Sequence, residues 1–260
     1  MIAPLDATIS AIASGIDDPD DPRALDIARA RRHADAAQLL RRDLQAIAAE
    51  VFAPRVRLTP LEWGEQFYEL PESSAVRGLF DVSRMPYLRG VFDALHDPRV
   101  RRVVVAKGSQ LAFTTVGQIW AGWMMHQSPA AMLSIWPTEG LLKRYVLTRI
   151  NPMLEQVDPL KAIFSRSGLR ESDDSIKHKG GPGFTLDFIS AKSTNELRSI
   201  SAERIHVSEV DELDEDLGDQ GDPLELARRA LRTYEHTAKE YLECTPTIDG
   251  RSRVWQELSL

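Results

Sequence analysis

The sequence predicts an α/β fold in which a mostly parallel sheet is covered by helices on both faces and is preceded by an N-terminal helical segment. Two observations support this prediction. Short apolar runs rich in β-branched residues, such as 102–106 and 204–208, are typical of strands buried in a parallel sheet. Longer segments with helical spacing of apolar residues lie between such runs, and strands that alternate with helices favour parallel pairing.

The first part of the chain differs in composition from the rest. Residues 1–23 are acidic and interrupted by Pro and Gly, whereas 24–51 contains neither and repeats apolar residues at helical spacing. The second stretch is therefore predicted to be an amphipathic helix. We divide the chain into an acidic lead-in with this helix, over 1–57, and one main domain over 58–260. A helix with Thr59 as its N-cap opens that domain.

The main domain is expected to continue with strands and helices in alternation. The polar, Gly-containing stretch 165–183 is interpreted as a hairpin or loop. The other expected strands are 131–136, 184–190 and 240–244, and the expected helices are 114–126, 138–150, 152–164 and 223–234.

Composition excludes several classes of protein. The chain has 260 residues, with 32 Lys and Arg against 39 Asp and Glu, for a net charge of −7. Its single cysteine, Cys244, excludes an internal disulfide framework. The sequence has no apolar stretch long enough to span a membrane. The acidic balance means that any contact with nucleic acid must come from a local basic patch.

The loop that follows strand 102–106 is a candidate phosphate site. A strand, a loop of small residues and then a helix is the setting in which backbone N–H groups bind phosphate. The loop departs from the standard G-x-x-x-x-G-K-S/T pattern, because Ala112 stands at the last glycine and Phe113 at the lysine. An ordinary turn is the alternative, but Lys107 at the loop entrance could reach phosphates. The candidate residues are Lys107, Gly108, Ser109, Gln110, Leu111, Ala112, Phe113, Thr114 and Thr115.

Carboxylates follow strand 204–208 directly. Glu209, Asp211 and Glu212 would therefore lie at the carboxyl edge of the sheet, where open α/β folds bind ligands. Such a position suits groups that hold Mg²⁺ and orient a water toward a γ-phosphate. A solvated acidic loop is the alternative. A metal-dependent nuclease built on 209–216 is disfavoured, because two-metal sites collect ligands from several strand ends. Packing or solvation accounts for His206 and His178 better than metal binding.

A third segment, Glu243-Cys244-Thr245-Pro246-Thr247, indicates by itself only that a strand ends before the proline. Together, and in order, these segments resemble the large terminase subunit of tailed phages, in its lambda-like branch. The likeness runs from about Leu58 to the end of the chain. The stretches that carry it are Leu58–Trp63, Leu70–Ser74, Pro86–Arg89, Asp93–Arg99, Trp136–Thr138, Asn151–Met153, Ser208–Asp211 and Thr245–Gly250.

The resemblance implies a P-loop NTPase-like fold and a role for each candidate residue. In this branch the loop lysine commonly stands at the entrance, so Lys107 would bind the β- and γ-phosphates, and Thr114 would ligate Mg²⁺. Glu209 would orient the attacking water, with Asp211 or Glu212 as the metal carboxylate. An alternative register makes Asp211 the metal residue and Glu212 the catalytic one.

Three further features follow from the resemblance. Thr245 would couple hydrolysis to movement. Ser208 stands where the family usually has its Mg²⁺-coordinating aspartate, and Ala112 replaces a glycine. An arginine finger is also implied, with four candidates: Arg149, Arg198, Arg229 and Arg232.

The implied function is that of the ATPase portion of a phage DNA-packaging motor, with ATP and Mg²⁺ as cofactors. The implied partners are double-stranded DNA, the portal protein, the small terminase subunit and further copies in a ring, with no membrane. The implied location is the host cytoplasm, at the portal vertex of the procapsid. The family carries a nuclease domain after the ATPase, so we expect no nuclease activity from a chain that ends at Leu260. A catalytically impaired nucleotide-binding or structural module of the same fold is the alternative.

Overall fold

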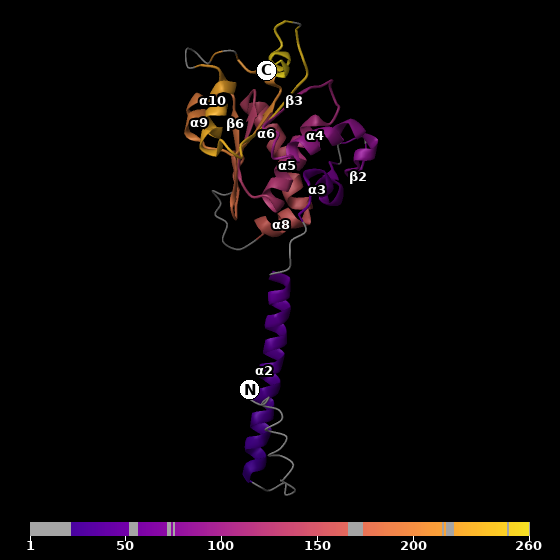
Figure 1. The fold of residues 1–260 in the computed structure, drawn as a ribbon, viewed down its shortest axis with the longest axis vertical. Coiled ribbons are helices and arrows are strands. Elements are labelled where there is room, and N and C mark those ends of the chain that lie inside the picture. Colours follow the sequence, from indigo (N-terminus) through magenta and orange to yellow (C-terminus); the bar gives the residue numbers. More distant parts are fainter. Residues whose placement is uncertain are drawn as a thin grey trace. The chain divides into compact units, whose positions relative to one another are not determined.

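The structure is a computed structural model that forms two compact units, residues 1–56 and 57–260. The residues it describes are 22–51, 57–71, 74, 76–165, 174–214, 216, 221–248 and 250–259. In the first unit this description covers one helix, α2 (Pro22–Val51), which confirms the helix predicted over 24–51 (Figure 1). The predicted acidic lead-in lies outside the described residues, apart from its last two positions. None of the described helices is long and apolar enough to cross a membrane.

The second unit is built on a six-stranded sheet with the order β3-β8-β7-β4-β6-β5. Neighbouring strands are parallel except for β5, which pairs antiparallel with β6. This hairpin begins within the stretch 165–183, which was interpreted as a hairpin or loop and of which 166–173 lie outside the described residues. The mostly parallel sheet predicted from the sequence is therefore confirmed. The strands are β3 (Arg102–Ala106), β4 (Ala131–Trp136), β5 (His178–Gly181), β6 (Phe184–Ser190), β7 (Arg204–Ser208) and β8 (Lys239–Cys244).

Helices surround this sheet, and the two long helices predicted at 138–150 and 223–234 are each divided. A π-helical turn, η3 (Val146–Ile150), follows the first, and a 3-10 helix, η6 (Ala230–Tyr234), follows the second. Two helices that the sequence did not indicate, α9 and α11, have only six residues each, too few for a periodic pattern. The α-helices are α3 (Pro60–Phe67), α4 (Arg89–His96), α5 (Phe113–Gln127), α6 (Glu139–Tyr145), α7 (Asn151–Gln156), α8 (Asp158–Phe164), α9 (Thr194–Ser199), α10 (Pro223–Arg229) and α11 (Arg253–Leu258).

Short elements complete the second unit. They are β1 (Glu69–Leu70), β2 (Gly78–Leu79), η1 (Val82–Arg84), η2 (Pro86–Leu88) and η5 (Val210–Glu212). The predicted start of α3 is confirmed in detail. The Thr59 hydroxyl accepts a hydrogen bond from the Glu62 N–H, and the Glu62 carboxylate accepts one from the Thr59 N–H. This reciprocal pair satisfies two of the N–H groups that a helix start leaves free.

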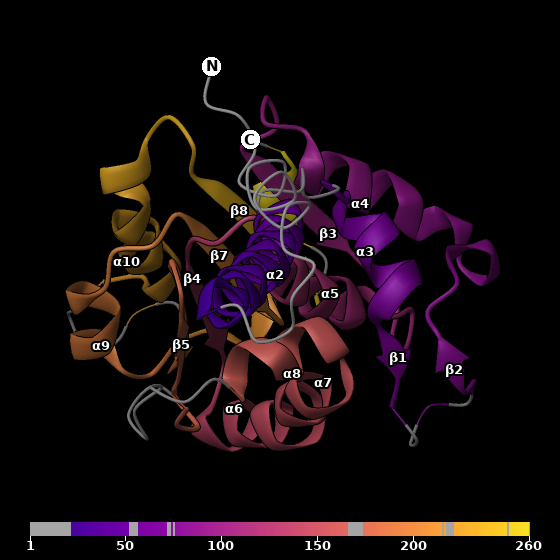
Figure 2. The same ribbon diagram turned by 90° about the horizontal axis from the view of Figure 1, so that it is seen from below.

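Alternation along the strands sends side chains into two cores, one on each face of the sheet. On β4, Met132 and Trp136 join the core under α5, whereas Leu133 and Ile135 join the core under α9 and α10. Figure 2 shows α3, α4 and α5 on one side of the strands and α9 and α10 on the other. Both faces of the sheet are therefore covered, as the apolar character of the strands predicts.

Helix α5 packs unusually close to the sheet because of Gly117. A Cβ atom at this position would lie only 2.6 Å from Cε1 of His206, a residue of β7. His206 is itself fixed, because its ring stacks on Tyr241 of β8 with the centroids 5.2 Å apart. The beginning of α5 is thus held against the ends of β7 and β8.

Candidate functional site

The candidate site lies where three neighbouring strands end. The order β3-β8-β7 brings together the residues that follow these strands, which are Lys107, Thr245 and Glu209. Backbone hydrogen bonds continue past the strand ends, from the Lys107 N–H to the Cys244 carbonyl at 2.8 Å and from the Glu209 N–H to the Glu243 carbonyl at 2.8 Å. Three segments that are distant in the sequence therefore share one rigid edge.

Lys107 is the central cation of this edge, and it is buried. Its Nζ lies 2.7 Å from Glu209 Oε1, 3.2 Å from Glu243 Oε2 and 3.4 Å from the Thr245 hydroxyl. Burial alone would lower the pKa of Lys107, but the carboxylates of Glu243 and Glu209 outweigh it and raise that pKa. The lysine therefore remains charged at neutral pH.

The loop between β3 and α5 has a strained backbone. Among the described residues, the non-glycine positions with positive φ are Gln110 at 61°, Ala112 at 62° and Glu209 at 54°. All three belong to the predicted site. Ala112 is the N-cap of α5 and makes no side-chain cap, so it places a Cβ in the left-handed region that glycine tolerates best. Strain of this kind, when it is concentrated at one site, is a sign of function.

The remaining loop residues divide into exposed and buried groups. Residues 108–111 are exposed ahead of α5, whose first N–H groups are the kind that bind phosphate. Phe113, at the usual lysine place, is buried with its ring 5.8 Å from that of Tyr87. Thr114 and Thr115 are half-buried. The aromatic residue is therefore a core residue at the helix start, and Lys107 is the cation of the loop.

Glu243 is a member of the site whose role the sequence did not indicate. It lies on β8 directly opposite Ser208 of β7, and its side chain is completely buried. Its Oε1 accepts hydrogen bonds from the Ser208 hydroxyl at 2.7 Å and the Thr114 hydroxyl at 3.0 Å. His206 Nε2 is 3.8 Å from the same oxygen.

This environment keeps Glu243 ionised despite its burial. Loss of water alone would raise the pKa of Glu243. The neighbouring imidazole of His206, the ammonium of Lys107 and the hydroxyl of Ser208 outweigh that effect, and the pKa lies below its ordinary value. A negative charge is therefore stable at the base of the site.

The three predicted carboxylates after β7 occupy different surroundings. Glu209 contacts Lys107, and its Oε2 also accepts a hydrogen bond from the Thr245 N–H at 3.2 Å. Asp211 faces a different segment: its oxygens accept bonds from the Thr247 N–H at 3.0 Å and the Val254 N–H at 2.9 Å. Glu212 is exposed. The structure thus brings Glu209 to Lys107, whereas Asp211 holds the segment that leads into α11.

The predicted Mg²⁺ site can be tested against the oxygen atoms present. Mg²⁺ in proteins is typically bound through one or two carboxylates together with substrate phosphates and water, not in an all-protein cage. Within the described part of the chain, no group of three His, Cys, Asp or Glu side chains could hold a metal ion. The Thr114 hydroxyl lies beside Glu243, and the buried Oε2 of Glu243 makes no hydrogen bond with a described residue. These two oxygen atoms are the kind of donors that a nucleotide-bound Mg²⁺ requires.

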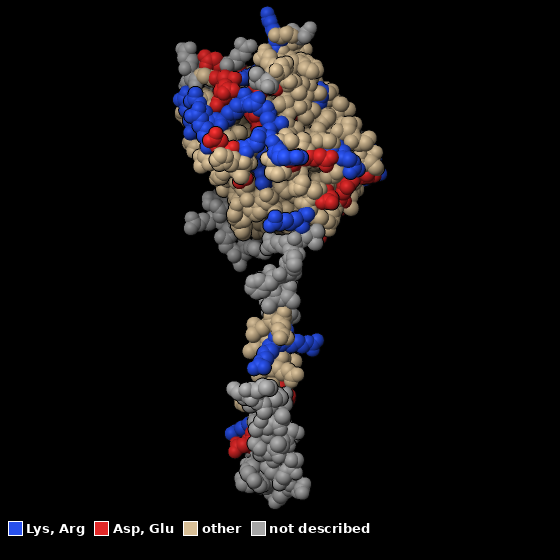
Figure 3. All heavy atoms as spheres, viewed as in Figure 1, with Lys and Arg blue, Asp and Glu red and all other residues tan. Residues whose placement is uncertain are grey.

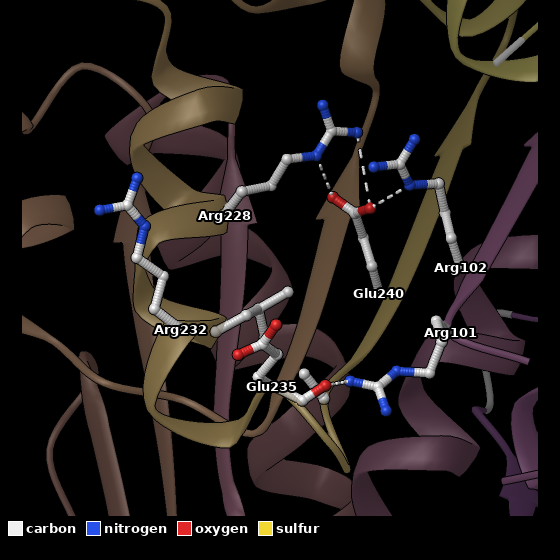
Figure 4. A pocket seen from close by; sticks show the side chains of 8 residues that line it. Arg101, Arg102, Arg228, Arg232, Glu235 and Glu240 are labelled. Carbon is white, nitrogen blue, oxygen red and sulfur yellow. Dashed lines mark hydrogen bonds and ion pairs between the residues drawn. The ribbon is translucent and has the colours of Figure 1, made fainter. Parts of the chain in front are cut away.

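A separate, arginine-lined hollow lies at the opposite ends of the strands. Its volume is about 570 Å³, and Figure 4 shows that Arg102 and Arg228 both point to the carboxylate of Glu240, near the start of β8. Arg228 Nε is 2.9 Å from Glu240 Oε1, and Arg102 Nε is 2.6 Å from Glu240 Oε2. Arg232, one of the candidate arginine fingers, also lines this hollow. Within one chain, Arg232 therefore lies at the opposite ends of the strands from Lys107.

The charges on the molecular surface are mixed. Figure 3 shows a group of basic side chains in the upper left of the viewed face, interleaved with acidic ones. His178 is hydrogen-bonded to Asp187 at 2.6 Å, and His206 is buried in the core. Both histidines therefore have the packed or paired environments expected from the sequence.

The fold and the arrangement at the strand ends define an α/β protein of the P-loop NTPase-like class. The chain belongs to the family described as phage terminase large subunit gpA, ATPase domain, whose profile matches residues 74–259. It is 24% identical over 220 residues to the large subunit of terminase from Escherichia phage lambda. That match covers 83% of this chain and 33% of the lambda protein, so the chain spans about one third of that relative.

The fold is also similar to that of a solved terminase. The crystal structure of the HK97 bacteriophage large terminase matches with a TM-score of 0.59 and 11% sequence identity. The match covers 77% of this chain and 40% of the HK97 chain. The family resemblance and the fold class predicted from the sequence are both confirmed.

Proposed function

We propose that this chain binds ATP at the Lys107 loop and hydrolyses it to drive movement of double-stranded DNA into a procapsid. The observation that carries the proposal is the contact of Lys107 with Glu209 at the ends of adjacent strands, beside the start of α5. Phosphoryl transfer needs positioned charges more than covalent chemistry. A cation for the phosphates and a carboxylate for the attacking water are two of the charges that such a site requires.

Each residue has a proposed role in this reaction. Lys107 binds the β- and γ-phosphates, the N–H groups of 108–113 surround them, and Thr114 contributes its hydroxyl to Mg²⁺. Mg²⁺ supplies positive charge that stabilises the phosphate oxygens. Glu209 is favoured as the residue that orients water, because it contacts Lys107 while the Asp211 oxygens accept bonds from Thr247 and Val254.

The test of these roles is a pair of matched substitutions. Glu209→Gln should leave ATP affinity nearly unchanged and lower turnover by two or more orders of magnitude, because the amide cannot accept a proton from water. Glu212→Gln serves as the control and should keep most of the turnover. The opposite result would assign catalysis to Glu212 and support the alternative register.

The larger role in packaging is proposed from membership of the family. We propose that the chain acts in a homo-oligomeric ring in the host cytoplasm at the portal vertex, with DNA, the portal protein and the small terminase subunit as partners. In such a ring, a neighbouring subunit can supply the arginine finger, which is worth about 10³–10⁵ in rate. Turnover should therefore rise with protein concentration, and constant specific activity on dilution would contradict the proposal.

Two expectations concern DNA: how strongly the chain binds it and whether the chain cuts it. With a net charge of −7, the chain should bind DNA weakly and only at low salt. Incubation with plasmid and Mn²⁺ should leave the plasmid intact, because Glu209 and Asp211 contact different groups. Nicking that disappears on changing Asp211 and Glu212 would favour the nuclease hypothesis instead.

The second candidate is a nucleotide-binding module without catalysis. Ala112, which adds a Cβ to the loop in place of a glycine, and the serine at position 208 favour this alternative. Tight ATP binding with no turnover, at any protein concentration and with or without DNA, would establish it.

A further inference from the structure

The carboxyl end of β7 carries a hydroxyl where a Mg²⁺-binding carboxylate is expected. Ser208 is the last residue of β7 and is 1% exposed. Its hydroxyl donates to Glu243 Oε1 at 2.7 Å. Because Ser208 and Glu243 are directly opposite in the parallel pairing of β7 with β8, their side chains leave the sheet on the same face.

We infer that Glu243, from β8, supplies the metal-site carboxylate that Ser208 lacks, and that Ser208 orients it by hydrogen bonding. The inference rests on the proposed nucleotide site. Glu243 lies on the strand next to Ser208 and contacts Thr114, the residue proposed to ligate Mg²⁺.

The hydrogen bond from Thr114 supports this assignment. A hydroxyl has one proton and two lone pairs. Thr114 gives its proton to Glu243 Oε1 at 3.0 Å, which leaves its lone pairs available for a cation. An acceptor on the strand side of the hydroxyl therefore fixes the orientation that a metal ligand needs.

The charge and burial of Glu243 support it further. Its side chain has no exposed surface, and its Oε2 lies 3.2 Å from Lys107 Nζ but makes no hydrogen bond with a described residue. A buried anion with unused acceptor capacity is costly unless something else needs it. A divalent cation brought by the nucleotide would use that capacity.

A purely structural ion pair with Lys107 is the competing explanation. It predicts that loss of the Glu243 charge changes stability but leaves metal affinity unaltered. The two explanations separate when Mn²⁺, which replaces Mg²⁺ and has an electron paramagnetic resonance signal, is titrated in the presence of ADP. ADP affinity measured with EDTA gives the metal-free reference.

Three variants make the test specific. Glu243→Gln should lower Mn²⁺ affinity by about 10–100-fold while metal-free ADP affinity changes by less than about threefold. Glu240→Gln is the matched control, because it removes a buried carboxylate from the same strand at the opposite edge of the sheet, and it should leave Mn²⁺ affinity unaltered. Ser208→Asp combined with Glu243→Ser returns the carboxylate to β7 and should recover most of the Mn²⁺ affinity.

The possible results separate this inference from the proposed function. If wild-type protein binds no ADP, both are overturned. If wild-type protein binds ADP and Mn²⁺ while folded Glu243→Gln binds Mn²⁺ equally well, only the metal role of Glu243 is overturned. Should Glu243→Gln fail to fold, the double variant decides, and a folded double variant without Mn²⁺ affinity overturns the inference.

Discussion

Replacement of Lys107 by methionine should destabilise the main domain in a strongly pH-dependent way. Methionine keeps the length of the side chain but removes the only ammonium recorded within 4 Å of the Glu243 carboxylate in the described residues. The loss of one partner from a buried pair typically costs about 3–5 kcal/mol, because the other charge loses its counter-ion. The hydroxyls of Ser208 and Thr114 still donate to Glu243 in the variant. Glu209 is affected less, since 27% of its side chain is exposed to water.

Protonation of Glu243 sets an upper limit on this cost. A glutamate with an ordinary pKa of 4.5 needs about 1.4 kcal/mol per pH unit above that value to take up a proton, which amounts to about 3.4 kcal/mol near pH 7. The variant should therefore lose up to about 3 kcal/mol of unfolding free energy near pH 7, but only about 1.4 kcal/mol near pH 5.5, one unit above the ordinary value.

The sign follows from the two proton affinities. In the wild type, the pKa of Glu243 is depressed, so its contribution to stability is present above the ordinary value of 4.5 and is lost as the pH falls through the folded-state pKa. In the variant, Glu243 loses one of the groups that offset its burial, so we expect burial to raise that pKa and stability instead to be lost as the pH rises above 4.5. The difference between the two proteins should therefore grow with pH.

Urea unfolding followed by tryptophan fluorescence between about pH 5.5 and pH 8 measures this difference. The control is the double variant, Lys107→Met with Glu243→Gln, which buries neither charge and should recover most of the lost free energy. A Lys107→Met protein within about 0.5 kcal/mol of wild type near pH 7.5, or a double variant no more stable than the single one, would contradict this prediction.

Three further predictions concern the loop, α5 and the cysteine. Gly117→Ala should cost about 1–3 kcal/mol in thermal unfolding, because the added methyl group meets His206. The control is Gly90→Ala, whose methyl group meets nothing within 4 Å and which should be neutral or stabilising. Equal melting temperatures of the two variants would contradict the close packing at Gly117. Ala112→Gly should stabilise the domain by about 0.5–1 kcal/mol in the same assay. The relief of left-handed strain exceeds the cost of the greater conformational entropy that glycine gives the unfolded chain. Destabilisation would mean that the loop is not strained at this position. Burial raises the pKa of Cys244 from 9.0 to about 12. Alkylation of this thiol near pH 8 should therefore be about 10³-fold slower in the native protein than in urea. Fast labelling of the native protein would show that the end of β8 opens.

The strands and the loop were predictable from the sequence because their signals are local. The run 102–106 is β-branched and is followed at once by a small-residue loop, and β3 has the same bounds in the structure. The departures at Ala112 and Ser208 were equally visible as single residues. Such features need no knowledge of which strands are neighbours.

The role of Glu243 could not be predicted in this way, because it depends on long-range pairing. Its contact with Thr114 joins residues 129 positions apart, and its pairing with Ser208 exists only because β8 lies between β3 and β7. A signal was present in the sequence: in the predicted strand 240–244, Glu243 shares the face of Tyr241. A charged residue at an inward position of a buried strand near its carboxyl end is a candidate site residue.

The assignment of Asp211 shows the opposite limitation. Its spacing after β7 suits a metal ligand, but both of its oxygens accept hydrogen bonds from residues at least 36 positions later in the chain. These bonds hold Thr247 and the start of α11 against the end of β7. A short acidic run therefore contains carboxylates with different tasks, and only the tertiary contacts distinguish them.

The hydrogen bonds at the strand ends also connect phosphate binding at the Lys107 loop with the position of the segment after β8. Glu209 accepts bonds from the Lys107 ammonium and from the Thr245 N–H, and Lys107 also lies 3.4 Å from the Thr245 hydroxyl. A phosphate that attracts Lys107 competes with Glu209 and Thr245 for the three N–H donors of the same ammonium. Because the Thr245 N–H is bonded to Glu209, any shift of that carboxylate acts directly on the backbone that leads to Thr247 and Asp211. The shared hydrogen bonds thus provide a physical basis for the coupling role expected of Thr245, and that role does not require a separate moving element.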